Sequence, residues 1–228
     1  MDNNQLVKLV DELKISKDQI LREEAEMLFL NEFANDKLSS DIAFYGGTAL
    51  RLAYDCPRFS EDIDLIVIRA TKFNDFKTFI DKIVQKNTNW SLKDIKDKRN
   101  TMFALFAIRE EKLKHDFSLK IEIHKPAKKV NLKMELSLIK SPASVFQPLL
   151  LVPTLEELKR MKEDAIMDRK KARDVFDLWF ISQALRINLE LPKKMPKYSK
   201  KEFENELKVF LPKKYYPIVT QLYAKITK

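Results

Sequence analysis

Glycine is nearly absent from this chain of 228 residues, which contains 2 glycines where average usage would give about 16. The two are adjacent, as Gly46 and Gly47. Turns elsewhere must be built from Pro, Asn, Asp and Lys, whereas at this one place the backbone keeps residues without a side chain. The scarcity excludes collagen-like and glycine-rich disordered chains, and it directs attention to residues 46–47.

Cysteine and histidine are also scarce, with one cysteine, Cys56, and two histidines, His115 and His124. A single cysteine cannot form an internal disulfide, so nothing indicates an oxidising compartment. Three such side chains cannot complete a tetrahedral zinc site without carboxylates. Because Cys56 precedes a proline and lacks a basic partner, we do not expect it to act as a nucleophile.

Long apolar runs are missing too. No uninterrupted stretch approaches the roughly 20 residues of a membrane helix, and residues 1–14 are too polar for a signal peptide. Hydrophobic residues make up 45% and charged residues 34% of the chain, which excludes disorder. We therefore expect a cytoplasmic protein without a membrane partner, built as one large domain or two small ones.

Positive charge is concentrated near the C-terminus. The net charge is +9, and residues 191–228 carry 10 lysines and 3 glutamates, a net of +7, which leaves +2 for residues 1–190. Tyrosines are interspersed among the lysines of this basic tail. The lysines are Lys193, Lys194, Lys197, Lys200, Lys201, Lys213 and Lys214, and the tyrosines are Tyr198, Tyr215 and Tyr216. The pattern suits RNA, through phosphate neutralisation and base stacking, and equally suits a solvated surface.

Periodicity divides the chain into two parts. Strands are expected at 41–45, 63–68, 101–108, 117–124 and 132–138, and helices after a capping box at Ser16, at 48–54 and at 73–85. Prolines 142, 148 and 153 interrupt any regular element between 141 and 153, and only helical patterns follow a second capping signal at Thr154. The sequence predicts an α/β domain over 1–140, a linker over 141–153 and an α-helical lobe over 154–228.

Carboxylates gather just after the glycines. Asp62 and Asp64 enter a strand, where residues two apart face the same side, so both side chains should converge. Paired carboxylates suit Mg²⁺, which prefers oxygen ligands. Glu122 and Glu135 each alternate with apolar residues, so each lies on the polar face of its strand. The two are alternatives for a third carboxylate. We favour Glu122, because its strand should pair with the one at 101–108.

A second constellation lies in the expected helical lobe. Lys162 and Arg169 recur at helical spacing, and Asp174 and Asp177 lie three apart beside Arg173. Two basic groups on such a face can hold a triphosphate opposite a metal ion. The alternative is a set of structural ion pairs on a surface helix.

These residues carry a family resemblance. Gly46-Gly47-Thr48-Ala49-Leu50, followed by Arg58-x-Ser60-x-Asp62-x-Asp64-Leu65, resembles the signature of AbiEii/AbiGii-type nucleotidyltransferases, which belong to the DNA polymerase beta superfamily and include type IV toxins. The block Leu158-x-x-Met161-Lys162-x-x-Ala165-x-x-x-Arg169, then Arg173-Asp174-x-x-Asp177, is similar to the family's second motif. One departure is Met161, where the family usually has Glu; the substitution removes one carboxylate near the nucleotide.

The resemblance implies a polymerase-beta-like core with a mixed sheet and a metal-dependent transfer of NMP from an NTP to RNA, such as the 3′ end of tRNA. It implies a toxin with a cognate antitoxin, and a monomer. The implied roles are Mg²⁺ (or Mn²⁺) ligation by Asp62, Asp64 and Glu122, and nucleotide binding by Gly46, Gly47, Thr48, Arg58, Ser60, Lys162, Arg169, Asp174 and Asp177. Lys162, Arg58 and Ser60 would neutralise charge on the pyrophosphate. Of these three, Lys162 is counted as catalytic together with Asp62, Asp64 and Glu122.

Two other functions stay open at this stage. The same chemistry could serve a small-molecule acceptor such as an antibiotic, although a basic chain suits a cationic drug poorly. A non-catalytic relative that binds RNA or a protein partner is the third possibility, and Met161 favours it. The nucleotide that is used does not follow from the residues.

Overall fold

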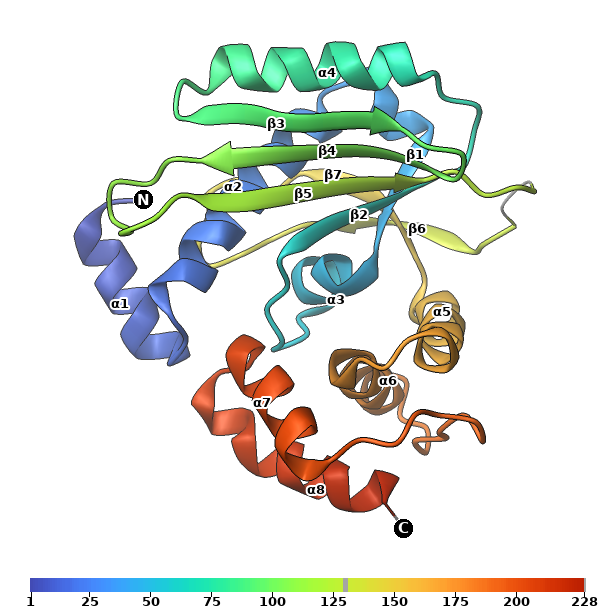
Figure 1. Cartoon of the computed structure of the whole chain (residues 1–228). Coiled ribbons are helices and arrows are strands. Elements are labelled where there is room, and N and C mark those ends of the chain that lie inside the picture. Colours follow the sequence, from blue (N-terminus) through green and yellow to red (C-terminus); the bar gives the residue numbers. More distant parts are fainter. Residues whose placement is uncertain (129–130, 228) are drawn as a thin grey trace.

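The centre of the molecule is a five-stranded mixed sheet with the order β1-β2-β5-β4-β3 (Figure 1). The strands are β1 Ile42–Tyr45, β2 Asp62–Val67, β3 Trp90–Asp97, β4 Thr101–Ile108 and β5 Phe117–His124. β2 and β5 are parallel, and the other neighbours are antiparallel. This computed structural model describes residues 1–128 and 131–227, so Lys228, the end of the predicted lobe, lies outside it. The predicted α/β class with a mixed sheet is confirmed.

Helices α2 (Lys17–Ala34) and α4 (Phe73–Lys86) supply the apolar residues that cover the sheet. Phe29 of α2 lies 5.5 Å from Phe79 of α4 and 6.3 Å from Phe106 of β4, measured between ring centroids. All three side chains are buried, so this aromatic group joins both helices to the sheet. Hydrophobic burial of this kind stabilises the α/β part of the chain.

One helix and one strand of the main sheet escaped the sequence-based prediction. Helix α1 (Asn3–Leu13) begins at Asp2, whose carboxylate and the Gln5 side chain form a reciprocal capping box. Strand β3 is an edge strand with a register shift between Leu92 and Asp94. The shift breaks the alternation of polar and apolar residues, and an edge strand has less apolar surface to bury, so its pattern is weak.

The predicted linker contains a strand, so that prediction is wrong for 149–153. β6 (Met134–Leu138) pairs with β7 (Leu149–Pro153) in a separate two-stranded sheet. Leu150 and Val152 of β7 are buried in the main core. Pro148 precedes the strand and Pro153 ends it, and strand ends tolerate proline because no ladder N–H is lost there.

The remaining helices form a lobe with its own core, on the side of the molecule next to α3 (Gly46–Tyr54) (Figure 1). They are α5 Leu155–Asp168, α6 Ala172–Ala184, α7 Lys200–Phe210 and α8 Tyr216–Ile226. α5 starts where predicted, but within the described chain the Thr154 side chain makes no capping hydrogen bond. None of the helices in the described residues is long and apolar enough to cross a membrane.

The basic tail is folded into this lobe. Tyr198 is 8% exposed and packs edge-on against Phe203 with 5.5 Å between ring centroids. Tyr215 and Tyr216 are half-buried against the same core, whereas Lys193, Lys194 and Lys197 are exposed. The prediction of free stacking tyrosines is therefore wrong for Tyr198, because the lobe needs that ring in its core. Of the residues in the predicted RNA-binding pattern, these lysines are exposed and the tyrosines are packed against the core.

Candidate active site

A pocket of about 350 Å³ lies between the sheet and the helical lobe. Its volume falls in the range of small-ligand sites. The α/β part supplies Tyr45, Gly46, Gly47, Arg58, Ser60, Asp62, Asp64, Lys120 and Glu122, and the helical lobe supplies Leu158, Met161, Lys162, Ala165, Asp168, Arg169 and Arg173. The pocket therefore brings both motifs of the sequence together.

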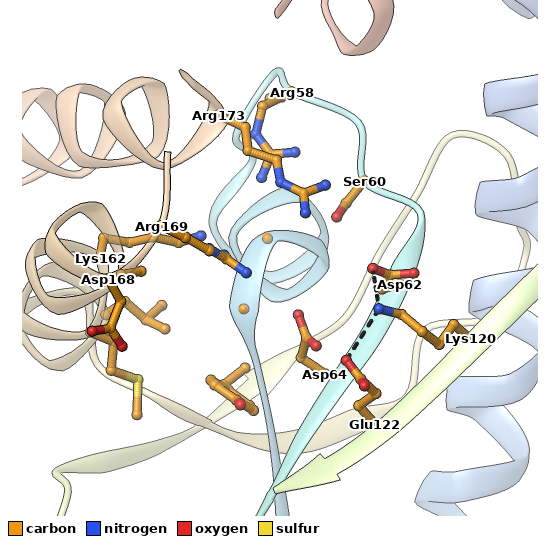
Figure 2. Close-up of a pocket in the computed structure, with 16 residues that line it drawn as sticks. Arg58, Ser60, Asp62, Asp64, Lys120, Glu122, Lys162, Asp168, Arg169 and Arg173 are labelled. Carbon is orange, nitrogen blue, oxygen red and sulfur yellow. Dashed lines mark hydrogen bonds and ion pairs between the residues drawn. The ribbon is translucent and has the colours of Figure 1, made fainter. Parts of the chain in front are cut away.

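Three carboxylates line one wall of this pocket. The parallel register of β2 and β5 places Asp62 beside Lys120 and Asp64 beside Glu122, while the intervening Ile63 is buried in the core. The same face of two adjacent strands thus carries all three acids (Figure 2). The alternation that predicted convergence of Asp62 and Asp64 holds in the structure.

The alternative third carboxylate, Glu135, lies elsewhere. It is on β6, which belongs to the separate two-stranded sheet, and it accepts a hydrogen bond of 2.6 Å from the Tyr54 hydroxyl. It does not belong to the pocket lining of the described residues. Of the two candidates left open by the sequence, the structure brings only Glu122 next to Asp64.

Lys120 is a site residue that sequence reasoning missed. Its Nζ lies 3.0 Å from Asp62 Oδ2 and 3.2 Å from Glu122 Oε2, so one ammonium bridges two carboxylates (Figure 2). The available signal was its position two residues before Glu122, on the same face of the strand. Its place next to Asp62, however, follows from the pairing of β2 with β5, which the sequence does not reveal.

Asp64 is the carboxylate with the most unusual environment. Burial, together with the negative charge of Asp62, raises the pKa of Asp64 to about 6. Gly46 has φ +85°, a backbone conformation that favours glycine, and a Cβ there would lie 2.5 Å from Asp64 Oδ2. Gly46 is therefore required because the Asp64 carboxylate packs against its Cα.

Gly47 makes room for another side chain. A Cβ at this position would overlap the Arg58 guanidinium and lie 3.0 Å from Ser60 Oγ. The next residue, Thr48, is buried and donates a hydrogen bond from its hydroxyl to the Asp62 carbonyl, which ties the start of α3 to β2. The nucleotide binding that the resemblance implies for both glycines stays a prediction. The structure shows a further reason for them, since their missing side chains make room for Asp64 and Arg58.

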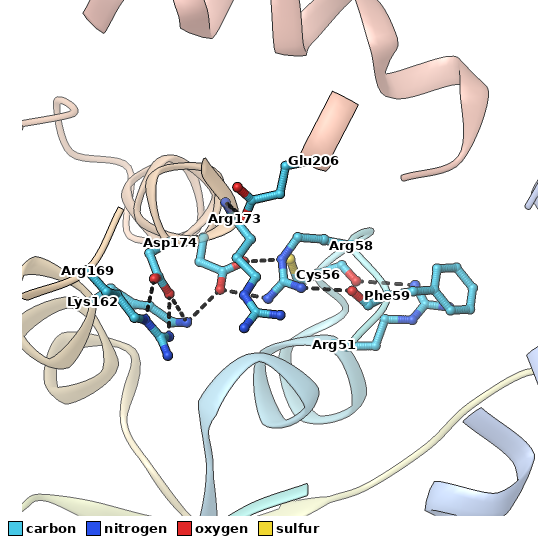
Figure 3. A network of polar contacts seen from close by, with 10 residues as sticks. Arg51, Cys56, Arg58, Phe59, Lys162, Arg169, Arg173, Asp174 and Glu206 are labelled. Atoms are coloured by element: carbon cyan, nitrogen blue, oxygen red, sulfur yellow. Dashed lines mark hydrogen bonds and ion pairs between the residues drawn. The ribbon is translucent and has the colours of Figure 1, made fainter. Parts of the chain in front are cut away.

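Arg58 joins the two lobes through a buried ion pair (Figure 3). Its Nε and Nη2 donate to the two oxygens of Asp177 at 2.7 and 2.8 Å, and Nη1 donates to the Phe59 carbonyl. The Arg58 side chain is 1% exposed and Asp177 0%. A buried bidentate pair of this kind fixes the position of both elements that carry it.

Lys162 and Asp174 extend this network. Lys162 Nζ lies 2.7 Å from Asp177 and 2.9 Å from Asp174, which also accepts two hydrogen bonds from the Arg169 guanidinium. Although burial favours the neutral acid, the charges of Lys162 and Arg169 lower the pKa of Asp174 to about 2. The lobe therefore keeps an ionised carboxylate behind the pocket wall.

Asp174 and Asp177 do not lie where nucleotide-binding residues were expected. Both are fully buried and neither lines the described pocket, so the interpretation as structural ion pairs fits them. Lys162 lines the pocket but is 7% exposed and already paired with both acids. It contributes positive charge to the pocket wall from a fixed position.

Two arginines offer accessible positive charge to the pocket. Arg169, directly after the end of α5, is half-exposed, and Arg173, in the first turn of α6, extends its guanidinium toward Ser60 (Figure 2). Within the described residues the Arg173 guanidinium has no carboxylate partner, and only its backbone N–H is bound, by Glu206. The sequence placed Arg173 in a motif without giving it a role, and its place in that motif was the usable signal.

The remaining wall is apolar, formed by Tyr45, Leu158, Met161 and Ala165. Met161 thus faces the pocket at the position where the resemblance leads one to expect a glutamate. Outside the pocket, burial raises the pKa of the Cys56 thiol to about 12, which disfavours the nucleophilic thiolate.

Comparison with known families decides what this site belongs to. The family model described as "Nucleotidyl transferase AbiEii toxin, Type IV TA system" matches residues 28–221. The chain belongs to the AbiEii family. It is a nucleotidyltransferase, and its family implies a cognate antitoxin.

Solved structures share this fold. The nucleotidyltransferase toxin MenT4 from Mycobacterium tuberculosis is 15% identical with a TM-score of 0.67, over 100% of this chain and 90% of that chain. JHP933 from Helicobacter pylori is 21% identical with a TM-score of 0.55, over 93% of this chain and 95% of that chain. Identities this low show a shared fold alone. The search of curated proteins found no match to the AbiEii-family chain.

Proposed function

We propose that this AbiEii-family protein transfers a nucleoside monophosphate from an NTP to an RNA acceptor, with the 3′ end of tRNA as the target. One observation carries the proposal: the wall with Asp62, Asp64 and Glu122 faces a wall with Arg169 and Arg173 across one pocket (Figure 2). Nucleotidyl transfer needs both, because the reacting phosphate and the pyrophosphate leaving group are anionic.

The acidic wall fits a divalent cation such as Mg²⁺ or Mn²⁺. Its donors are carboxylate oxygens, which Mg²⁺ prefers, and three acids on one wall favour a bound cation. Lys120 already provides one cation between Asp62 and Glu122. In the described residues no three acidic, histidine or cysteine side chains lie close enough together to hold an ion as they stand. We infer that the three acids are the ligands once Lys120 moves aside.

A bound divalent cation supplies Lewis-acid chemistry, since it polarises a phosphoryl oxygen and an attacking hydroxyl. The chain's own groups supply the rest. Arg173 and Arg169 neutralise the phosphates from the helical lobe, and Ser60 donates from the facing loop. The first backbone N–H groups of α3, at Gly46 and Gly47, add the positive end of a helix.

Lys162, Arg58, Asp174 and Asp177 act as positioning residues in this proposal. Their ion pairs hold α5 and α6 against the loop that carries Ser60, so that the cationic wall keeps its distance from the acidic wall. Pre-organised charge accelerates a reaction because the protein does not have to reorganise during the reaction.

The RNA acceptor is supported by the exposed lysines of the helical lobe, such as Lys193, Lys194 and Lys197. They lie in the lobe that forms one side of the pocket, and lysines there can neutralise the phosphates of a polyanion. The cognate antitoxin, a monomeric state and a cytoplasmic location remain predictions. Co-expression with the product of the neighbouring gene, expected to restore growth of cells that express this toxin, tests the antitoxin.

Incubation of total RNA with each α-labelled NTP and Mg²⁺ tests the function itself. We expect label on RNA of tRNA length with the wild-type protein and none with the Asp62→Ala/Asp64→Ala double variant, which should remain folded. Asp81→Ala, at an exposed acid of α4, is the matched control and should label as the wild type does. Undiminished labelling by the double variant would refute the proposed site.

A further inference from the structure

Lys120 occupies a position that the proposed chemistry leaves unexplained. It is the only lysine of β5, and its side chain points from the strand into the acidic wall, with 32% of its surface exposed. The parallel pairing of β2 with β5 fixes Asp62 beside it, and Glu122 follows two residues later on the same face. The strand geometry itself therefore sets this lysine between the two carboxylates.

Such a placement has an electrostatic reason. Three carboxylates on one wall repel one another, and a cation among them reduces that repulsion. An ammonium on a flexible four-carbon stem can fill this place and can also leave it. A divalent cation uses the same oxygens at about 2.0–2.1 Å, so the ion and the bridging ammonium exclude each other.

We propose that Lys120 is the resting counter-ion of the metal site, and that a divalent cation enters by displacing its ammonium from Asp62 and Glu122. The inference rests on the proposed function, because it takes these acids as the metal ligands. Two consequences follow. The metal-free protein depends on Lys120 for stability, and the ammonium competes with the ion, which lowers the apparent metal affinity.

Mn²⁺ binding measures this competition directly, without any turnover. Free Mn²⁺ is followed by its EPR signal, with the full chain as wild type and as Lys120→Met, a side chain of similar length without charge. If the bridged arrangement is present in nine of ten molecules, Lys120→Met should bind Mn²⁺ about tenfold more tightly. Its Tm in EDTA at pH 8 should be lower than that of the wild type, and its gain in Tm on adding Mn²⁺ larger.

Two further variants keep the test sharp. Lys125→Met removes a lysine that pairs with Asp97 outside the pocket, and its Mn²⁺ affinity should equal that of the wild type. Lys120→Arg keeps the charge and adds a bidentate donor, so it should bind Mn²⁺ more weakly than Lys120→Met does. Lys120→Arg should also bind Mn²⁺ more weakly than the wild type does, and this comparison decides the question even if Lys120→Met fails to fold.

Equal or weaker Mn²⁺ binding by Lys120→Met would overturn the inference, and so would the absence of Mn²⁺ binding by every variant. Weaker NTP binding with unchanged Mn²⁺ affinity would instead make Lys120 a phosphate ligand, and it would overturn the inference as well. The labelling of RNA judges the proposed function separately, because that assay does not depend on what Lys120 does at rest.

Discussion

Arg58 and Asp177 hold the two lobes together by two parallel hydrogen bonds of 2.7 and 2.8 Å, with both side chains shielded from solvent. They are 119 residues apart in the sequence, so the pair forms only when both lobes have docked. The acidic and cationic walls of the pocket are thereby held at a fixed separation.

Loss of one partner of this pair should be costly. Asp177→Asn leaves the Arg58 guanidinium buried without a counter-charge, and we expect the free energy of unfolding to fall by about 3–5 kcal/mol. Chemical denaturation measures the change. Lys37→Ala, which breaks an exposed pair with Asp75, should leave the midpoint nearly unchanged. Equal effects of the two substitutions would contradict the stabilising role of the Arg58–Asp177 pair.

Gly47→Ala should destabilise the fold as well as the site. The new methyl group overlaps the Arg58 guanidinium, which two hydrogen bonds to Asp177 hold in place. We expect a loss of about 1–3 kcal/mol in unfolding free energy, measured by chemical denaturation. A variant with wild-type stability would contradict this packing.

Asp174 should make stability depend on pH in acid. Its pKa of about 2 lies below the ordinary value of 3.8, so the folded state binds fewer protons than the unfolded state between these values. The contribution of the ionised form, about 2 kcal/mol, is complete above pH 4 and is lost as the pH falls toward 2. Unfolding of wild type and Asp174→Asn at several pH values tests this. Their difference should shrink below pH 4, and a constant difference would contradict the assignment.

RNA binding should depend on the lysines of the helical lobe. Truncation is a poor test, because Phe203, Leu207 and Leu222 of the basic tail are buried in the lobe core. Replacement of Lys193, Lys194 and Lys197 by Gln keeps the fold, and it should lower the slope of log K against log salt by about 2.

The matched control for this measurement changes equally many lysines on α4, which lies across the sheet from the helical lobe (Figure 1). Gln at Lys77, Lys82 and Lys86 should leave the slope as it is in the wild type. Equal slopes for both triple variants and the wild type would show that the lysines of the lobe only keep the surface solvated.

The sequence was sufficient for features that depend on local periodicity. Alternation in β2 predicted that Asp62 and Asp64 share a face, and the change from strand to helix patterns predicted that helices follow Thr154. It failed where the decisive neighbour is distant in the chain. Lys120 reaches Asp62 only because β2 pairs with β5, and Glu135 is excluded because β6 joins another sheet.

The two glycines show the same limit. Their rarity marked residues 46–47 as special, yet the reason lies in Asp64 and Arg58, whose side chains pack against them. Burial likewise decided the roles of the second motif. Helical spacing grouped Lys162 with Arg169, and Asp174 with Asp177, but whether these residues contact a ligand or one another depends on how α5 docks on α6. No local pattern contains that information.

One measurement tests the central claim most directly: the fate of the α- and γ-phosphates of the NTP. Two parallel reactions with tRNA and Mg²⁺ would use NTP labelled at one phosphate or the other, with Asp62→Ala/Asp64→Ala as the inactive control. Nucleotidyl transfer predicts α-label on tRNA lengthened at its 3′ end and γ-label in released pyrophosphate. Label from the γ-phosphate on the tRNA, or α-label transferred equally by the double variant, would contradict it.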